Sequence, residues 1–158
     1  MIVVLALLFV MAPQPGAQQI SEAQKKEFIE LLKTLPHKGE FFSDEAVKTA
    51  GPYLPVLFAL TGRDLEAYDL YPFMAISRGL CAHKEHRRYA ITHFGEMRHA
   101  ALKISWAAML FNEGERSPKI VQFLRGALRS HEQAGMLAEA LGPGFADFRR
   151  RVNAAAQR

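Results

Sequence analysis

Apolar residues recur at helical spacing through nearly all of the chain after residue 20, and this limits the fold more than any other feature. Phe28, Leu31, Leu32 and Leu35 fall at positions i, i+3, i+4 and i+7, which places them on one face of an α-helix. Similar stripes follow, and no alternating strand pattern competes with them. Residues 18–158 are therefore predicted to form one all-α domain, for which a hydrophobic content of 49% supplies a core.

Capping residues mark where several of these helices should begin. Ser21 and Gln24 have the spacing of a capping box at the start of the first helix. Ser43 is in position to cap a second helix. Ser117 and Pro118 combine an N-cap with a proline at the first helical position. The sequence therefore predicts helices that begin directly after Ser21, Ser43 and Ser117.

Proline and glycine indicate where other helices are interrupted. A segment that starts at Asp64 should be broken or kinked at Pro72, because proline removes a backbone donor and clashes with the preceding turn. Residues 85–111 should form two helices that meet near Gly95, because glycine weakens a helix interior and a single helix of this length is uncommon.

One segment near the C-terminus has a repeat-like pattern. Residues 131–142, HEQAGMLAEALG, have an acidic start followed by an alanine-rich helix that ends in Ala-Leu-Gly. This segment resembles the second helix of a HEAT repeat, and residues 119–129 would be its partner helix. A weaker echo at residues 96–102 lies about 36 residues earlier, near the short end of the HEAT period. The HEAT-like resemblance, mainly over residues 96–142, implies a short right-handed α-solenoid of helix pairs; the alternative is an irregular helical bundle.

The N-terminal segment has the pattern of a cleavable signal peptide. Residues 2–11 are an unbroken apolar run, a Pro/Gln/Gly-rich stretch follows, and no charged residue precedes Glu22. A membrane-spanning helix needs about 20 apolar residues, so this run is too short to anchor the protein. We therefore predict that residues 1–17 are a signal peptide, that no transmembrane anchor is present, and that the protein is exported to the bacterial periplasm or the extracellular space. The alternative is a buried N-terminal strand or helix in a cytosolic protein.

Basic residues supply a candidate binding surface. The formal net charge is +4, and basic residues cluster around Lys84, Arg87 and Arg88 and again at residues 149–151. A basic helix face can bind an anionic partner, although such a face is often only solvated. No aromatic and basic nucleic-acid module is visible. The predicted binding residues are Lys84, Arg87 and Arg88, and the predicted partner is another protein, for which an acidic surface would be complementary.

Histidines in the same region suggest an alternative, a metal site. His83, His86, His93 and Glu96 would share one broad face of a continuous helix, and Glu96 and His99 have the spacing of half a di-iron site. No second such pair and no HExxH motif is present. His86 and His93 would also lie about 10 Å apart along a straight helix. The simpler interpretation is that these histidines make ordinary hydrogen bonds.

The sequence contains no recognisable catalytic motif. Cys81 is the only cysteine, which excludes an intramolecular disulfide, and its apolar surroundings predict a core residue. A nucleophile elbow, a phosphate-binding glycine loop and a haem motif are all absent. We expect neither enzymatic activity nor a cofactor. The predicted function is protein binding by an exported helical-repeat protein, and the alternative is a periplasmic helical bundle that binds or depends on a metal.

Overall fold

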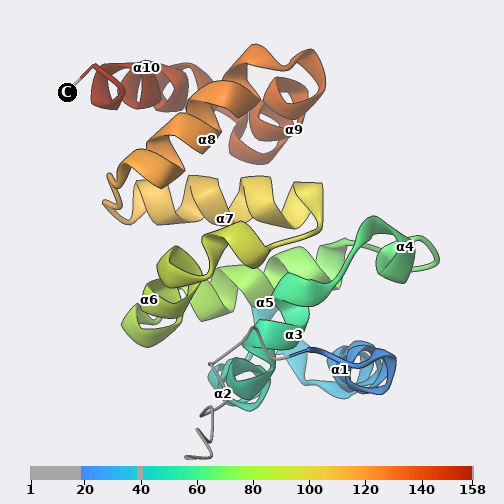
Figure 1. Cartoon of the computed structure of the whole chain (residues 1–158). Coiled ribbons are helices and arrows are strands. Elements are labelled where there is room, and N and C mark those ends of the chain that lie inside the picture. Colours follow the sequence, from blue (N-terminus) through green and yellow to red (C-terminus); the bar gives the residue numbers. More distant parts are fainter. Residues whose placement is uncertain (1–18, 39–40, 158) are drawn as a thin grey trace, which may run out of the picture.

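The computed structural model describes residues 19–38 and 41–157, and helices make up most of this part of the chain (Figure 1). The all-α prediction is confirmed. The predicted signal peptide, residues 1–17, lies outside the described residues. In chain order the elements, with η for 3-10 helices, are α1 (Glu22–Thr34), β1 (His37–Lys38), β2 (Phe41–Phe42), α2 (Asp44–Ala50), η1 (Gly51–Tyr53), α3 (Leu54–Ala59), α4 (Gly62–Leu65), α5 (Tyr71–Cys81), α6 (Lys84–Thr92), η2 (Phe94–Glu96), α7 (Ala100–Asn112), α8 (Pro118–Arg129), α9 (His131–Leu141), η3 (Gly142–Gly144) and α10 (Phe145–Ala155).

The three predicted helix starts are confirmed. Before α1, the hydroxyl of Ser21 accepts a hydrogen bond from the Gln24 N–H at 3.2 Å, and the Gln24 side chain accepts one from the Ser21 N–H at 2.9 Å. Before α2, the hydroxyl of Ser43 accepts from the Ala46 N–H at 3.2 Å. Helix α8 begins directly after Ser117, whose hydroxyl is buried and has no hydrogen-bond partner in the described structure.

The predicted interruption near Pro72 is confirmed, and the proline itself lies at the start of the second helix. Pro72 lies in the first turn of α5, where a missing N–H leaves no intrahelical hydrogen bond unmade. Earlier in the chain, Gly62–Leu65 form the separate short helix α4, which Thr61 caps by accepting a hydrogen bond from the Asp64 N–H. The interruption therefore lies between α4 and α5, and Pro72 belongs to the first turn of the second helix.

The expected pair of helices between residues 85 and 111 is confirmed. Helix α6 ends before α7 begins, and η2 and a short extended linker separate them. The backbone N–H of Arg98 in this linker donates to the Phe58 carbonyl at 3.0 Å, which ties the linker to α3. The weaker HEAT echo, residues 96–102, therefore spans the end of η2, the linker and the first turn of α7.

A two-residue antiparallel ladder between β1 and β2 was not expected from the sequence. His37 pairs with Phe42, and Lys38 pairs with Phe41. Strands this short cannot show the alternating pattern by which a strand is recognised in a sequence. The ladder presents the Phe41 side chain to solvent, with 60% of its surface exposed.

The helices pack in succession along the molecule. Helix α5 packs on α2 and on α7, α7 packs on α8 and α9, and α8 packs on α9 and α10. Figure 1 shows α1 and α2 at one end, and α10 with the C-terminus at the other. Helices α8 and α9 match the helix pair that was predicted at residues 119–129 and 131–142.

Close packing links both ends of this arrangement. One cluster of buried hydrophobic residues runs from Phe28 in α1 to Val152 in α10. Trp106 of α7 is fully buried and makes a T-shaped ring contact with Phe58, with 5.4 Å between the centroids. A Cβ atom at Gly79 would lie 2.5 Å from Val47, so α2 and α5 approach as closely as they do because α5 has a glycine there.

Among the described helices, none combines the length and the apolar character needed to cross a membrane.

Candidate binding groove

The predicted basic surface on α6 divides into exposed and engaged side chains. Lys84 and Arg88 are exposed. Arg87 is half-buried and donates hydrogen bonds to the carbonyls of Cys81 and Ala82, each at 2.8 Å. Its guanidinium also lies 3.4 Å from the Glu113 carboxylate, in the turn after α7. Arg87 therefore satisfies carbonyls at the end of α5, which otherwise lack partners.

The histidines around α6 are separated by the end of this helix. His83 and His86 lie together, with ring centroids 5.5 Å apart. The Nδ1 atom of His86 lies 3.2 Å from the Leu80 carbonyl. A Cβ atom at Gly51 would come within 2.9 Å of its Nε2 atom, so the ring packs against the backbone of η1. His86 thus connects α6 to α5 and η1.

The other members of the proposed metal set lie beyond the end of α6. His93 makes a 2.9 Å hydrogen bond to Glu96 and stacks on Tyr89. His99 precedes α7, and burial lowers its pKa, which favours the neutral imidazole. No three His, Cys, Asp or Glu side chains lie together as metal ligands in the described part of the chain. The structure does not bring His83, His86, His93, Glu96 and His99 together.

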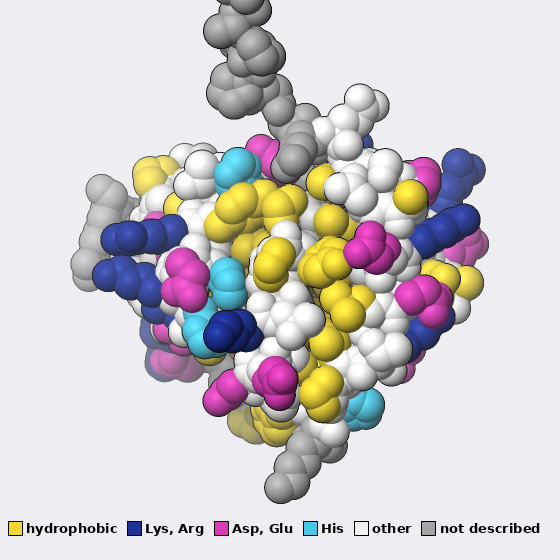
Figure 2. All heavy atoms as spheres, turned by 90° about the horizontal axis from the view of Figure 1, so that it is seen from below, with side chains coloured by type: hydrophobic (Ala, Val, Ile, Leu, Met, Phe, Trp, Pro, Cys, Tyr) yellow, Lys and Arg dark blue, Asp and Glu magenta, His cyan; other side chains and the backbone are white. Residues whose placement is uncertain are grey.

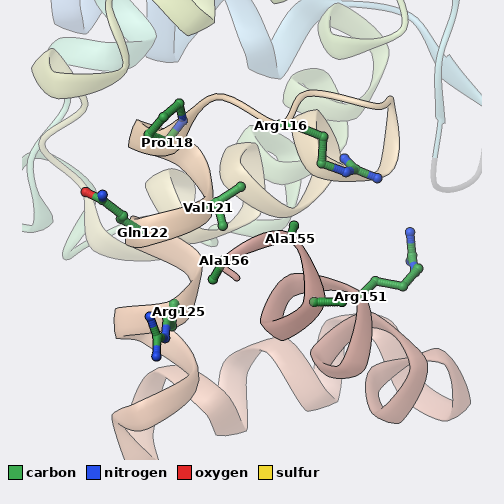
Figure 3. Close-up of a pocket in the computed structure, with 9 residues that line it drawn as sticks. Arg116, Pro118, Val121, Gln122, Arg125, Arg151, Ala155 and Ala156 are labelled. Atoms are coloured by element: carbon green, nitrogen blue, oxygen red, sulfur yellow. The ribbon is translucent and has the colours of Figure 1, made fainter. Parts of the chain in front are cut away.

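A hollow lies between α8 and α10. It has a volume of about 620 Å³ and is called the arginine groove below (Figure 3). Its lining combines three arginines with proline, valine, glutamine and alanine. The lining residues are Arg116, Pro118, Val121, Gln122, Arg125, Arg151, Ala154, Ala155 and Ala156.

The arginines lie at opposite ends of the groove. Figure 3 shows Arg116 and Arg151 on one side and Arg125 on the other, with Val121 and Ala155 between them. At the end with Arg116 and Arg151, both guanidinium groups lie over the ring of Phe111. Their central carbons are 3.8 and 5.7 Å from the ring centroid. Stacking on an aromatic face is favourable for arginine and holds its planar group in a defined orientation.

The turn before α8 positions Arg116. Gly114 adopts a φ of 97°, a left-handed conformation that glycine takes without steric strain. This turn reverses the chain after α7 and brings Arg116 back over Phe111. The Arg116 guanidinium donates hydrogen bonds to the carbonyls of Phe111 and Glu115. Within the described structure, no carboxylate lies at ion-pair distance from it.

The charges of the groove are only partly compensated. Arg151 donates to Asp147 at 2.9 Å and to Asn112 at 3.0 Å. Hydrogen bonds from Arg150 and then Arg151 lower the pKa of Asp147, so this carboxylate is ionised at neutral pH. The Arg125 side chain makes neither a hydrogen bond nor an ion pair with any described residue. The groove therefore presents two guanidinium groups, at opposite ends, that lack an acidic partner within the described residues.

Sequence reasoning found only part of this surface. The cluster at residues 149–151 was visible in the sequence, but neither Arg116 nor Arg125 was singled out. These residues are far apart along the chain, and the packing of α10 on α8 brings them together. The available signal was the spacing of Val121 and Arg125, which places them one helical turn apart on α8.

A second, smaller cavity of about 190 Å³ lies beside the β ladder. Aromatic side chains line it, including Phe41, Phe42 and Tyr71. Seen from the end that carries α1 and α2, hydrophobic side chains form a band across the molecule, with charged side chains on both sides (Figure 2). The surface at this cavity is apolar and does not specify the chemistry of an occupant, so the arginine groove is the better-defined site.

No protein-family model, curated protein or solved structure matches this chain at a significant level. The geometry of the helices and of the arginine groove is therefore the basis for assigning a function.

Proposed function

We propose that this chain is an exported, non-catalytic helical-repeat protein that binds another protein through the surface of its stacked helices. The observation that carries this proposal is the arginine groove, a large hollow whose lining combines guanidinium groups with small apolar side chains. Arginine is enriched in protein interfaces, where its planar group combines hydrogen bonding with stacking. A hollow between two helices also provides the concave surface that repeat proteins use to bind partners.

The order of helix packing supports a short right-handed solenoid of HEAT-like pairs. In a solenoid each repeat contacts only its neighbours. Helices α5, α7, α8 and α10 pack in succession, and α9 packs on α7 and α8. The α8–α9 pair also coincides with the segment whose sequence resembles a HEAT repeat. An irregular bundle is the alternative arrangement, and in it the helices around the continuous core would pack without such an order.

The chemistry of the described residues supports binding more strongly than catalysis or metal binding. Burial raises the pKa of the Cys81 thiol to about 11, so it is protonated at neutral pH and a poor nucleophile. The histidines of the alternative metal site lie in separate local contacts. Elemental analysis of protein purified without an affinity tag tests the alternative, and stoichiometric metal would favour it over our proposal.

Export is the second part of the proposal and has a separate test. The full chain is expressed in a bacterium with a C-terminal tag, the cells are fractionated, and the N-terminus of the product is sequenced. We expect mature protein in the periplasm that begins at Gln18, since residues 1–17 have the signal-peptide pattern. Cytosolic protein that retains these residues would contradict export.

Crosslinking in intact cells tests the binding function. The tagged full chain is crosslinked, purified from the envelope fraction and compared with an unrelated periplasmic protein of similar net charge. We expect one partner protein that the control does not recover, and we expect its recovery to fall when salt is raised before crosslinking, because basic surfaces contribute to binding. The absence of any specific partner would contradict the proposal.

A further inference from the structure

We infer that the arginine groove binds an extended acidic segment of the partner protein, with carboxylates at both ends of the groove and small side chains over its floor. This inference rests on the proposed protein-binding function and specifies the chemistry of the partner.

Uncompensated charge is the first reason for an acidic occupant. Within residues 19–38 and 41–157, Arg116 and Arg125 have no carboxylate at ion-pair distance. The one carboxylate bonded to a groove arginine, Asp147, is shared between Arg150 and Arg151. A groove with excess positive charge favours an anionic partner and attracts it over a distance.

The separation of the charges is the second reason. Arg116 and Arg151 stack over one ring at one end, while Arg125 lies at the other end, beyond the Val121 and Ala155 side chains (Figure 3). A ligand with a single anionic group would contact only one end. A segment with spaced carboxylates reaches both ends and covers the apolar floor between them, which adds burial of apolar surface to charge pairing.

The end of α10 favours a peptide over a free small anion. Residues 154–156, at the C-terminal end of this helix, line the groove. The carbonyls of Val152 and Ala154 in this last turn already accept hydrogen bonds from the Ala156 and Gln157 N–H groups. The C-terminal end of a helix carries partial negative charge, which disfavours a small free anion beside it. A peptide can instead place its carboxylates at the arginines and its small side chains beside the alanines of α10.

Arg116 is held in position before any ligand arrives. Its guanidinium is fixed by hydrogen bonds to two backbone carbonyls and by stacking on Phe111. A side chain that is already ordered loses little rotamer entropy when it binds a carboxylate. Bidentate pairing between arginine and carboxylate is also among the strong, directional interactions in proteins.

Fluorescence anisotropy with a defined probe tests the inference. The full-length protein is titrated into a fluorescein-labelled octapeptide of alternating glutamate and alanine, and into the same peptide with glutamine in place of glutamate. We expect saturable binding of the acidic peptide only. Arg125→Gln is expected to raise its Kd about fivefold, since it removes one exposed charge pair. Ala154→Glu places a negative charge in the groove at an exposed position and should weaken binding similarly.

Arg129→Gln is the matched control, because Arg129 lies on the same helix, is exposed and does not line the groove. It should leave the Kd unchanged. Equal weakening by Arg125→Gln and Arg129→Gln would overturn the inference, as would equal binding of both peptides or no binding of the acidic peptide. Displacement of the bound acidic peptide by equimolar citrate would show that a free carboxylate is sufficient and would overturn the peptide assignment.

Failure of the inference can be separated from failure of the proposed function. If crosslinking recovers a specific partner but Arg125→Gln and Ala154→Glu do not reduce its recovery, the protein binds a partner elsewhere and the groove assignment is wrong. If no partner is recovered while the acidic peptide binds, the groove binds acidic segments but the proposed cellular function fails.

Discussion

The arginines of α6 and those of the arginine groove differ in what they already bind. Arg87 on α6 spans the junction of α5 with α6 by donating to two backbone carbonyls and approaching Glu113. Arg125 in the groove has no partner among the described residues. The comparison shows that basic residues can differ in their contacts once the chain is folded. Arg116 also donates to two backbone carbonyls, but unlike Arg87 it has no carboxylate at ion-pair distance within the described residues.

The largest expected effect is a loss of stability caused by weakening the packing of α10 beside the arginine groove. Phe148 is fully buried in α10 and packs edge-on against Phe111, 5.4 Å between ring centroids. Phe148→Ala should lower the free energy of unfolding by about 3–5 kcal/mol, because it removes a large buried side chain and leaves a cavity. Urea denaturation measures this loss.

Hydrogen exchange on Phe148→Ala also tests the repeat arrangement. In a solenoid with nearest-neighbour packing, protection should fall in α8 and α10 and persist in α2 and α5. A uniform loss of protection from α1 to α10 would instead indicate one bundle that opens as a unit. It would also contradict the expectation that the helices of the arginine groove open independently of α6.

The next largest effect should come from Arg87. Arg87→Met keeps most of the side-chain stem but removes the hydrogen bonds to Cys81 and Ala82, so we expect a loss of about 2 kcal/mol in the free energy of unfolding. Arg88→Met, on the exposed side of the same helix, should change it by less than about 0.5 kcal/mol. Equal effects in urea denaturation would show that Arg87 has no special structural role.

Cys81 provides a local probe of the same junction. Its thiol is buried, and burial raises its pKa to about 11, so alkylation by iodoacetamide at pH 8 requires the junction to open. Arg87→Met should increase the labelling rate about tenfold, while Arg125→Gln should leave it unchanged. Mass spectrometry follows the labelling. Similar acceleration in both variants would mean that the two regions are not independent.

The same thiol predicts a pH dependence of stability. The unfolded thiol loses its proton near its ordinary pKa of 9.0, while the folded thiol does so only near 11. Deprotonation therefore favours the unfolded chain as pH rises through this interval, and the contribution of Cys81 to stability should decline there. Urea denaturation at several pH values should show a steeper decline for wild type than for Cys81→Ala. Parallel curves would contradict the raised pKa.

Salt should give the smallest effect and should separate binding from folding. The Debye length falls from about 10 Å at 0.1 M salt to about 3 Å at 1 M. The Kd of the acidic peptide should therefore rise severalfold, because Arg125 is exposed. The Arg87 hydrogen bonds are short-range, and the one to the Cys81 carbonyl is part-buried, so the stability difference between wild type and Arg87→Met should persist. A salt-independent Kd would contradict charge pairing in the groove.

Much of the fold could be predicted because its signals are local. The caps at Ser21 and Ser43 and the start of α8 depend on residues within one helical turn. The interruption near Pro72 was also predictable, because proline is unfavourable inside a helix and favourable in its first turn. The β ladder lacked a detectable period because each strand has two residues.

The candidate site was harder to predict because it depends on packing. Lys84, Arg87 and Arg88 were prominent in the sequence, but the capping role of Arg87 depends on where α5 ends and where Glu113 lies. The arginine groove requires α10 to pack on α8, and the turn at Gly114 to return Arg116 to Phe111. Neither contact follows from residue spacing within a single helix.

Nuclear magnetic resonance titration tests the central claim most directly, because it locates the binding surface without a mutation. The isotope-labelled full chain is titrated with the glutamate–alanine octapeptide, and backbone amide shifts are followed. The account predicts the largest changes at Gln122, Arg125, Ala155 and Ala156, which line the groove, and small changes in α6. Changes centred on Lys84 and Arg88, or no localised changes at saturation, would contradict it.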